Sequence, residues 1–113
     1  MSDKDRINIL SILDAINKII EYSEEYENAD QFNQSQRDFD AAMMNFIIVG
    51  EMIARLSDEF IEKYHHIDWF KIRGLRNVVA HEYFGIDAEE VWQIIQNHVP
   101  KLKSDLTKIL NVL

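Results

Sequence analysis

The chain contains only three glycines and one proline in 113 residues. These two residue types supply most tight turns and interrupt regular helices, so a chain with so few of them has few turns. Its hydrophobic residues also recur at spacings of three and four, which is the period of an amphipathic helix. We therefore expect an all-α fold, with four main helices in an up-down bundle and a short helix at the C-terminus.

The length and composition predict one domain over residues 1–113. Hydrophobic residues make up 47% of the chain and charged residues 28%, the balance of a soluble globular protein. The length falls within the usual size range of a single domain. The chain has no cysteine, which excludes disulfides, thiolate metal sites and cysteine nucleophiles.

The N-terminal segment and the apolar runs predict a cytoplasmic protein that does not associate with membranes. Residues 1–6 carry charges of both signs, unlike the start of a secretory signal. The purely apolar run at residues 46–49 is far shorter than the about 20 residues that a membrane-spanning helix needs.

Apolar periodicity and turn residues define the first half of the bundle. A first helix is predicted over residues 4–27, with Ser2 or Asp3 as its N-cap. Residues 28–34 are expected to form a loop in which Phe32 packs inward. A second helix is predicted over residues 35–56, followed by a short helical turn at residues 60–64.

Capping signals define the second half of the predicted bundle. Asp68 is a plausible N-cap for a third helix over residues 69–81. Asp87 with Glu90 three residues later resembles a capping box that starts a fourth helix. Pro100 suits the first turn of the last helix. Trp69 and Trp92 lie beside apolar helix positions, so we expect both in the core.

The third predicted helix gathers basic and polar side chains on one face. With about 100° of rotation per residue, its core stripe consists of Ile72, Leu75, Val78 and Val79. The opposite arc carries Arg73, Arg76, Asn77 and His81. Residues 69–81 contain no carboxylate, although the whole chain carries 20 acidic residues and a net charge of −8.

These residue types fit phosphodiester chemistry. The guanidinium of arginine is always charged and offers a planar fork of donors that matches phosphate oxygens. Histidine, whose unperturbed pKa is about 6.5, can remove and return a proton near neutral pH. Arg76 and His81 together can activate a ribose 2′-hydroxyl and stabilise charge on the attacked phosphate without a metal. The alternative is a solvated helix face that ends in a histidine.

The spacing of Arg76 and His81 also bears on how such a site would be assembled. The two residues stand about 140° apart around a helix, so they cannot form an ordinary i,i+4 pair. They can act on one ligand only if the helix ends near His81 or if a second copy of the chain completes the site. This geometry favours a composite site across a dimer.

Residues 76–83, RNVVAHEY, resemble the R-x4-H-x-Y motif of the HepT-like branch of the HEPN superfamily. The resemblance extends to the segment that precedes the motif, to the Gly50–Glu51 pair of the second helix, and to residues 83–92. It covers most of the chain. It implies a single HEPN-like helical domain that forms a homodimer, with an RNase site in the cleft between the subunits.

The resemblance implies a metal-independent endoribonuclease that needs no cofactor and acts as the toxin of a toxin–antitoxin pair. Its catalytic residues would be Arg76 and His81, with Asn77 in the same site. Cleavage of RNA by transesterification would leave a 2′,3′-cyclic phosphate. The expected partner is a minimal nucleotidyltransferase antitoxin that can adenylylate Tyr83, because the added AMP would repel RNA at the mouth of the site.

Two further residues are candidates for supporting roles. Arg73 belongs to the basic face, and Glu51 is a carboxylate in an otherwise apolar helix. Glu51 can serve as an internal hydrogen-bonding group or a dimer contact, or it can position His81 or an arginine. The sequence does not separate these roles. His65 and His66 have only Asp68 as a nearby potential ligand, so no metal site is expected.

The net charge of −8 argues against binding to nucleic acid or anionic lipid by charge alone. Five of the 20 acidic residues lie between positions 21 and 30, away from the basic face, which leaves that face to select where RNA binds. The acidic surface also suits a second hypothesis, a non-catalytic helical subunit that docks onto a nucleotidyltransferase. A third is a helical scaffold whose basic face is only solvated.

Overall fold

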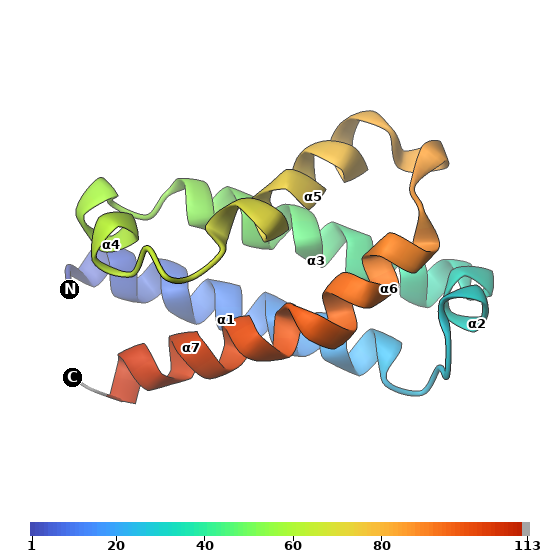
Figure 1. Cartoon of the computed structure of the whole chain (residues 1–113), viewed down its shortest axis with the longest axis horizontal. Helices are drawn as coiled ribbons and strands as arrows, with labels where there is room; N and C mark the ends of the chain where they lie inside the picture. The colour runs from blue at the N-terminus through green and yellow to red at the C-terminus, as the bar shows by residue number, and fades with distance from the viewer. Residues whose placement is uncertain (112–113) are drawn as a thin grey trace.

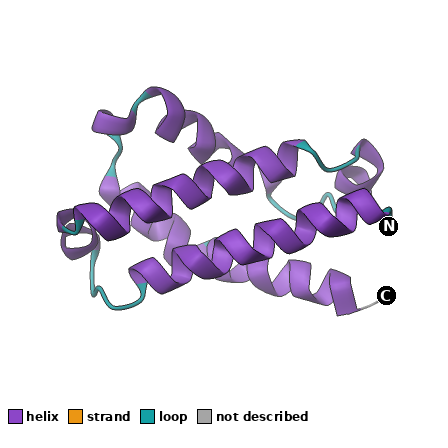
Figure 2. Cartoon of the chain, turned by 180° about the vertical axis from the view of Figure 1, so that it is seen from behind, coloured by secondary structure: helices purple, strands orange, loops and turns teal. Residues whose placement is uncertain are grey.

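The computed structural model describes residues 1–111, and every regular element within them is a helix (Figure 2). In chain order these are α1 (Asp3–Ser23), α2 (Ala29–Gln34), α3 (Gln36–Ala54), α4 (Asp58–Lys63), α5 (Trp69–His81), the 3-10 helix η1 (Tyr83–Gly85), α6 (Ala88–Asn97) and α7 (Val99–Asn111). The expected all-α fold is confirmed. Over the same residues, no helix is long and apolar enough to span a membrane.

The long helices pack around α3 and α1. Helix α3 contacts α1 on one side and α5 on another, and α1 in turn contacts α7 (Figure 1). Helix α1 begins and α7 ends at the same end of the molecule, while η1 arches outward between α5 and α6 (Figure 1). The fully buried side chains include Ile9, Ile12, Ile16 and Ile19 of α1, Met43, Phe46 and Val49 of α3, and Leu106 of α7. Helix α5 therefore lies on the outer side of α3, with much of its surface open.

The expected loop at residues 28–34 is wrong, because Ala29–Gln34 forms α2. The side chain of Asn28 caps this helix by accepting a hydrogen bond from the backbone N–H of Gln31 at 2.9 Å. Phe32 is fully buried, as predicted, with its ring centre 5.3 Å from that of Phe39 and 5.8 Å from that of Trp92. Burial of one aromatic ring stabilises a helix too short to form by itself.

Helix α1 ends at Ser23 instead of continuing to residue 27. The Ser23 hydroxyl donates to the carbonyl oxygen of Ile19 at 2.8 Å, a local bond that competes with further helix. The residues that follow include Glu24, Glu25 and Glu27, and negative charge is unfavourable at the C-terminal end of a helix.

Two other expectations about the helices are corrected. The C-terminal helix α7 is not short, since its 13 residues equal the length of α5. Pro100 does lie in its first turn, as predicted. Val78 is 38% exposed and not part of the core stripe, whereas Ile72, Leu75 and Val79 are buried. Val78 instead lines a groove between α5 and α6.

A buried aspartate fastens the start of α1 to the start of α4. The Asp5 carboxylate accepts hydrogen bonds from the backbone N–H of Ser57 at 2.8 Å and from its hydroxyl at 2.6 Å. Burial by itself would raise the pKa of Asp5, but the hydrogen bonds from Ser57, with a smaller one from Ser2, outweigh it and lower the pKa. This link fixes the turn after α3, and so the direction in which the chain leads into α5.

Candidate functional site

Helix α5 carries most of the predicted site residues, and its predicted bounds of 69 and 81 are confirmed. The Asp68 carboxylate caps its N-terminus by accepting from the backbone N–H of Lys71 at 3.2 Å. Trp69 is buried, and its indole N–H donates to the carbonyl oxygen of Tyr64 at 3.1 Å. These anchors fix the rotation of α5, which places Arg76 toward α3 and His81 at the outer end of the helix.

Arg76 joins α5 to α3 through Glu51. Its Nε donates to Oε1 of Glu51 at 2.8 Å, and its Nη2 lies 2.5 Å from the same oxygen. Its Nη1 donates to Oδ1 of Asn77 at 3.1 Å. Three of the five N–H donors of the guanidinium are thus used, and one remains on each terminal nitrogen for an anionic ligand. The structure therefore brings Arg76, Asn77 and Glu51 together, and Glu51 contacts an arginine rather than His81.

Gly50 allows the stem of Arg76 to lie directly on the backbone of α3. A Cβ atom at position 50 would lie 2.5 Å from Cβ of Arg76 and 2.8 Å from its Cγ, which is closer than such atoms approach in proteins. Gly50 receives the stem of Arg76 while Glu51 holds its head group. Sequence reasoning assigned no role to Gly50, although its pairing with Glu51 was part of the resemblance and was the available signal.

His81 is the last residue of α5, and its side chain is exposed. Among residues 1–111, no hydrogen bond or ion pair involves His81, and none joins it to Arg76. One chain therefore presents Arg76 and His81 at two separate places on α5 and does not bring them together.

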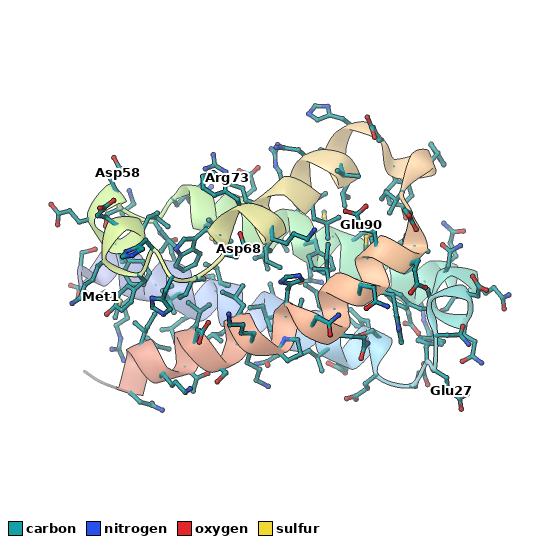
Figure 3. All side chains as sticks on the ribbon, viewed as in Figure 1. Met1, Glu27, Asp58, Asp68, Arg73 and Glu90 are labelled. Atoms are coloured by element: carbon teal, nitrogen blue, oxygen red, sulfur yellow. The ribbon has the colours of Figure 1, made fainter. Side chains whose placement is uncertain are left out.

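Arg73 is exposed and projects outward from α5 (Figure 3). No ion pair holds it within the part of the chain that the structure describes. The α5 surface from residue 69 to 81 therefore carries positive charge that no nearby carboxylate neutralises. The exception is Arg76, which pairs with Glu51.

Tyr83 lies in η1, two residues beyond His81. Its ring packs against the edge of the core, and its hydroxyl oxygen is buried without a hydrogen-bond partner in residues 1–111. The ring of Phe84 stands edge-on to it, with ring centres 5.6 Å apart, and Phe84 itself is fully exposed. The hydroxyl that the resemblance designates for modification thus faces inward.

The remaining histidine and tryptophan candidates lie outside the residues that contact Arg76. Nowhere in residues 1–111 do three His, Asp or Glu side chains lie close enough together to hold a metal ion. His65 is exposed, and its Nδ1 lies 2.9 Å from the carbonyl oxygen of Glu62. Trp92 is half-buried against Phe32, so it packs at the edge of the core.

Comparison with known proteins gives a consistent assignment. The family model described as "Ribonuclease HepT-like" matches residues 12–109. A Methanocaldococcus jannaschii protein called "Putative RNase MJ1380" is 31% identical over 107 residues, which cover 94% of this chain and 97% of that protein. The "Probable ribonuclease HepT" of Thermococcus cleftensis is 27% identical over 98 residues, covering 87% and 88%.

A longer relative from M. jannaschii, "Gamma-glutamylcyclotransferase and putative RNase MJ0434", is 35% identical over 108 residues. The alignment covers 96% of this chain but only 48% of that relative, so the chain spans about half its length. No solved structure matches the chain.

Proposed function

This chain belongs to the HepT-like ribonuclease family, and we propose that it is a metal-independent endoribonuclease. The observation that carries the proposal is the state of Arg76. Glu51 and Asn77 fix its guanidinium in place, yet two N–H donors remain for a phosphate. A positively charged fork held in this way costs little reorganisation when charge develops on a phosphate.

In the proposed reaction, His81 removes the proton from a ribose 2′-hydroxyl, and the 2′-oxygen attacks the adjacent phosphorus. The bond from phosphorus to the 5′-oxygen breaks, and the imidazolium of His81 returns the proton to that oxygen as it leaves. Arg76 stabilises the extra negative charge on the phosphate oxygens. The products are a 2′,3′-cyclic phosphate and a free 5′-hydroxyl.

We further propose that a second copy of the chain completes the site. Arg76 and His81 do not meet within one chain, so a neighbouring subunit has to supply one of them. Beside Glu51 lies a surface that we call the α1–α3 apolar face, formed by Ile7, Leu10, Met44 and Ile48, which are 38–62% exposed. Ile7, Leu10 and Ile48 also line one groove of about 480 Å³.

An exposed apolar surface of this kind marks a contact with another protein. Ile48 lies one helical turn from Glu51, so a second subunit on the α1–α3 apolar face would adjoin the Arg76–Glu51 pair. A twofold axis through this face would bring two basic α5 helices to one cleft. This arrangement supports RNA binding by a chain whose net charge is −8.

The biological role we propose is that of a toxin neutralised by a minimal nucleotidyltransferase antitoxin. The antitoxin would transfer an adenylyl group from ATP to the Tyr83 hydroxyl, releasing pyrophosphate. Because this hydroxyl is buried, the transfer would require η1 to move outward. Mass spectrometry after co-expression tests this point: an added adenylyl group on Tyr83 supports it, and unmodified Tyr83 in a fully neutralised protein contradicts it.

The main experiment uses purified protein and labelled single-stranded RNA, with EDTA present. The wild type should cleave the RNA and leave a 2′,3′-cyclic phosphate. His81→Ala and Arg76→Ala should each lower the rate by at least about 100-fold. His66→Ala and Arg6→Ala replace exposed residues of the same types elsewhere and should cleave normally.

Three results would contradict the proposed mechanism. A requirement for Mg²⁺ would exclude metal independence, and normal cleavage by either site variant would exclude the assigned catalytic roles. A wild-type protein that never cleaves RNA but binds tightly to a nucleotidyltransferase would instead be the non-catalytic subunit.

A further inference from the structure

A groove of about 290 Å³ lies between α5 and α6, and no residue of α3 lines it. Leu75 and Val78 on α5 and Val91 and Ile94 on α6 form apolar parts of its wall, and Lys71, Asp87 and Glu90 are its charged lining residues. Neither the RNase motif nor the Arg76–Glu51 pair uses it. We propose that this groove binds one unpaired guanine of the RNA substrate, an inference that rests on the ribonuclease function proposed above.

Phe70 at the rim of the groove provides a surface on which a base can stack. Its ring is 82% exposed, and it is followed along α5 by Lys71 and Arg73, which can reach the phosphates. An exposed aromatic ring beside cationic side chains is the usual arrangement for binding single-stranded nucleic acid. Phe84 is also exposed, but it does not line the groove, and the residue two positions before it is Glu82.

Gly74 leaves bare backbone on the same wall of the groove, one turn beyond Phe70. A Cβ atom at this position would meet nothing within 4 Å, so no contact within the chain requires glycine there. Glycine is nevertheless unfavourable in the interior of a helix compared with alanine. The missing side chain allows the edge of a ligand to approach the helix between Phe70 and Val78.

Glu90 gives the groove its selectivity for a base. The Asp87 carboxylate is engaged in capping α6, since its Oδ1 accepts from the backbone N–H groups of Glu89 at 3.0 Å and Glu90 at 3.3 Å. The Glu90 carboxylate lines the groove on the side of α6 that faces α5 (Figure 3), and no hydrogen bond or ion pair within residues 1–111 engages it. A carboxylate with two free oxygens binds best to two adjacent N–H donors. Among the RNA bases, only guanine presents such a pair on its pairing edge, at N1 and N2.

The groove is placed to act together with His81. Phe70, Gly74, Val78 and His81 follow one side of α5, and the helix carries no carboxylate from residue 69 to 81. Phe70 and His81 are eleven residues apart, a rise of about 16 Å along the helix. A strand that follows this side of α5 would have its guanine in the groove a few nucleotides from the phosphate next to His81.

The test measures binding of short labelled oligouridylates to the full chain carrying His81→Ala, so that the RNA stays intact. One oligonucleotide contains a single guanine, a second contains inosine in its place, and a third has an abasic nucleotide there. We expect the guanine oligonucleotide to bind tightest. Inosine lacks only the 2-amino group and should bind about tenfold more weakly.

Two pairs of variants assign the effect to the groove. Phe70→Ala should weaken binding of the guanine oligonucleotide about 5- to 150-fold and leave the abasic one almost unaffected. Phe84→Ala, its aromatic control, should change neither. Glu90→Gln should abolish the preference for guanine over inosine, whereas Glu89→Gln, its neighbour on α6, should keep it.

Gly74→Ala provides a test that does not depend on damage to the fold. Alanine should raise the melting temperature of the chain, because it favours helix, and should still weaken binding of the guanine oligonucleotide. Unchanged binding would show that no ligand approaches Gly74 and would overturn the claim that the base lies against the backbone of α5 there.

The remaining outcomes separate this inference from the function on which it rests. Cleavage of RNA by the wild type, together with normal guanine binding by Phe70→Ala and Glu90→Gln, overturns the guanine site alone. A wild type that neither binds nor cleaves RNA overturns both. If Phe70→Ala or Glu90→Gln changes the mass of the protein in solution and not its RNA affinity, the groove is a protein interface and the inference is wrong.

Discussion

At the residue scale, Arg76 has a structural role in holding α5 against α3 as well as its proposed role in RNA cleavage. Glu51 takes up two of its nitrogens, and Gly50 receives its stem against the backbone of α3. An arginine on a surface helix has many rotamers, so these contacts restrict it to the orientation in which its remaining donors face outward.

We predict that Glu51→Ala lowers kcat/KM for RNA about 100-fold, because the head group of Arg76 loses its orientation. Glu51→Gln keeps an oxygen acceptor at the same position and should lose much less. Steady-state cleavage assays of the two variants measure the difference. Equal losses would show that the negative charge of Glu51 matters and its positioning of Arg76 does not.

We predict that Gly50→Ala lowers the free energy of unfolding by about 1–3 kcal/mol, because α3 and α5 must separate to admit the methyl group. Gly74→Ala is the matched control, since open space surrounds that position and alanine should stabilise the helix by about 1 kcal/mol. Urea denaturation of both variants gives the two values. A stabilising Gly50→Ala would contradict the close packing of Arg76 on α3.

At the element scale, the start of α4 is attached to α1 by a single buried carboxylate, that of Asp5. The pKa of Asp5 is lowered in the folded chain, so its contribution to stability is present above its unfolded pKa of about 3.9 and is lost as the pH falls below it.

We predict that Asp5→Asn lowers the free energy of unfolding by about 1–3 kcal/mol near pH 7, and that the difference from wild type shrinks below about pH 4. Thermal unfolding across this pH range measures it. Asp58→Asn, which changes an exposed carboxylate in the first turn of α4, serves as the control. A difference that stays constant down to pH 3 would contradict the role of the charged form.

The element η1 holds the hydroxyl of Tyr83 in a buried place where it has no partner. A buried polar group without a hydrogen bond destabilises the fold, so Tyr83→Phe should raise the free energy of unfolding by about 1 kcal/mol. Differential scanning calorimetry of the two proteins checks the sign. A clear loss of stability would mean that the hydroxyl is hydrogen-bonded in solution.

The helix boundaries show which elements the sequence can predict. The bounds of α5 followed from Asp68, which caps the helix, and from a regular apolar stripe. The sequence did not predict helix α2, because its six residues are too few to show a helical period. This helix depends on burial of Phe32 against Phe39 and Trp92. Local signals define long amphipathic helices, whereas short ones depend on tertiary contacts.

The candidate site was predictable in part. The chemistry proposed for Arg76 and His81 rests on residue type and motif and stays a prediction, and the angle between them already indicated that one helix does not join them. The contact of Glu51 with Arg76 was one of several alternatives that remained open, and the role of Gly50 was missed. Both depend on how α3 and α5 cross, which the spacing of residues along one helix does not reveal.

At the scale of the whole molecule, the separation of Arg76 and His81 predicts how mixed dimers behave. If Arg76 of one subunit acts with His81 of the other, a dimer of Arg76→Ala and His81→Ala subunits contains one intact site and one doubly altered site. We therefore expect mixing and refolding of the two inactive proteins to restore part of the wild-type cleavage rate.

A mixture that stays inactive although mixed dimers form would show that each site uses both residues of one chain. The control is Ile48→Glu, which places a charge on the α1–α3 apolar face and should give monomers that cannot complement. Light scattering of this variant reports the change in mass.

If the chain acts as the toxin proposed above, the packing of Arg76 against Gly50 has a consequence for how cells escape it. Loss of the Arg76 side chain removes packing between α3 and α5 as well as a positive charge, so cells that survive through a change at this position should contain less of the protein. His81 is exposed at a helix end, so its loss should leave an abundant chain that lacks the proposed activity. A mixed dimer of one wild-type and one altered chain keeps one intact site in either case, so the two kinds of allele should differ in the amount of protein, normal for changes at position 81 and lowered for changes at position 76, as immunoblots would measure.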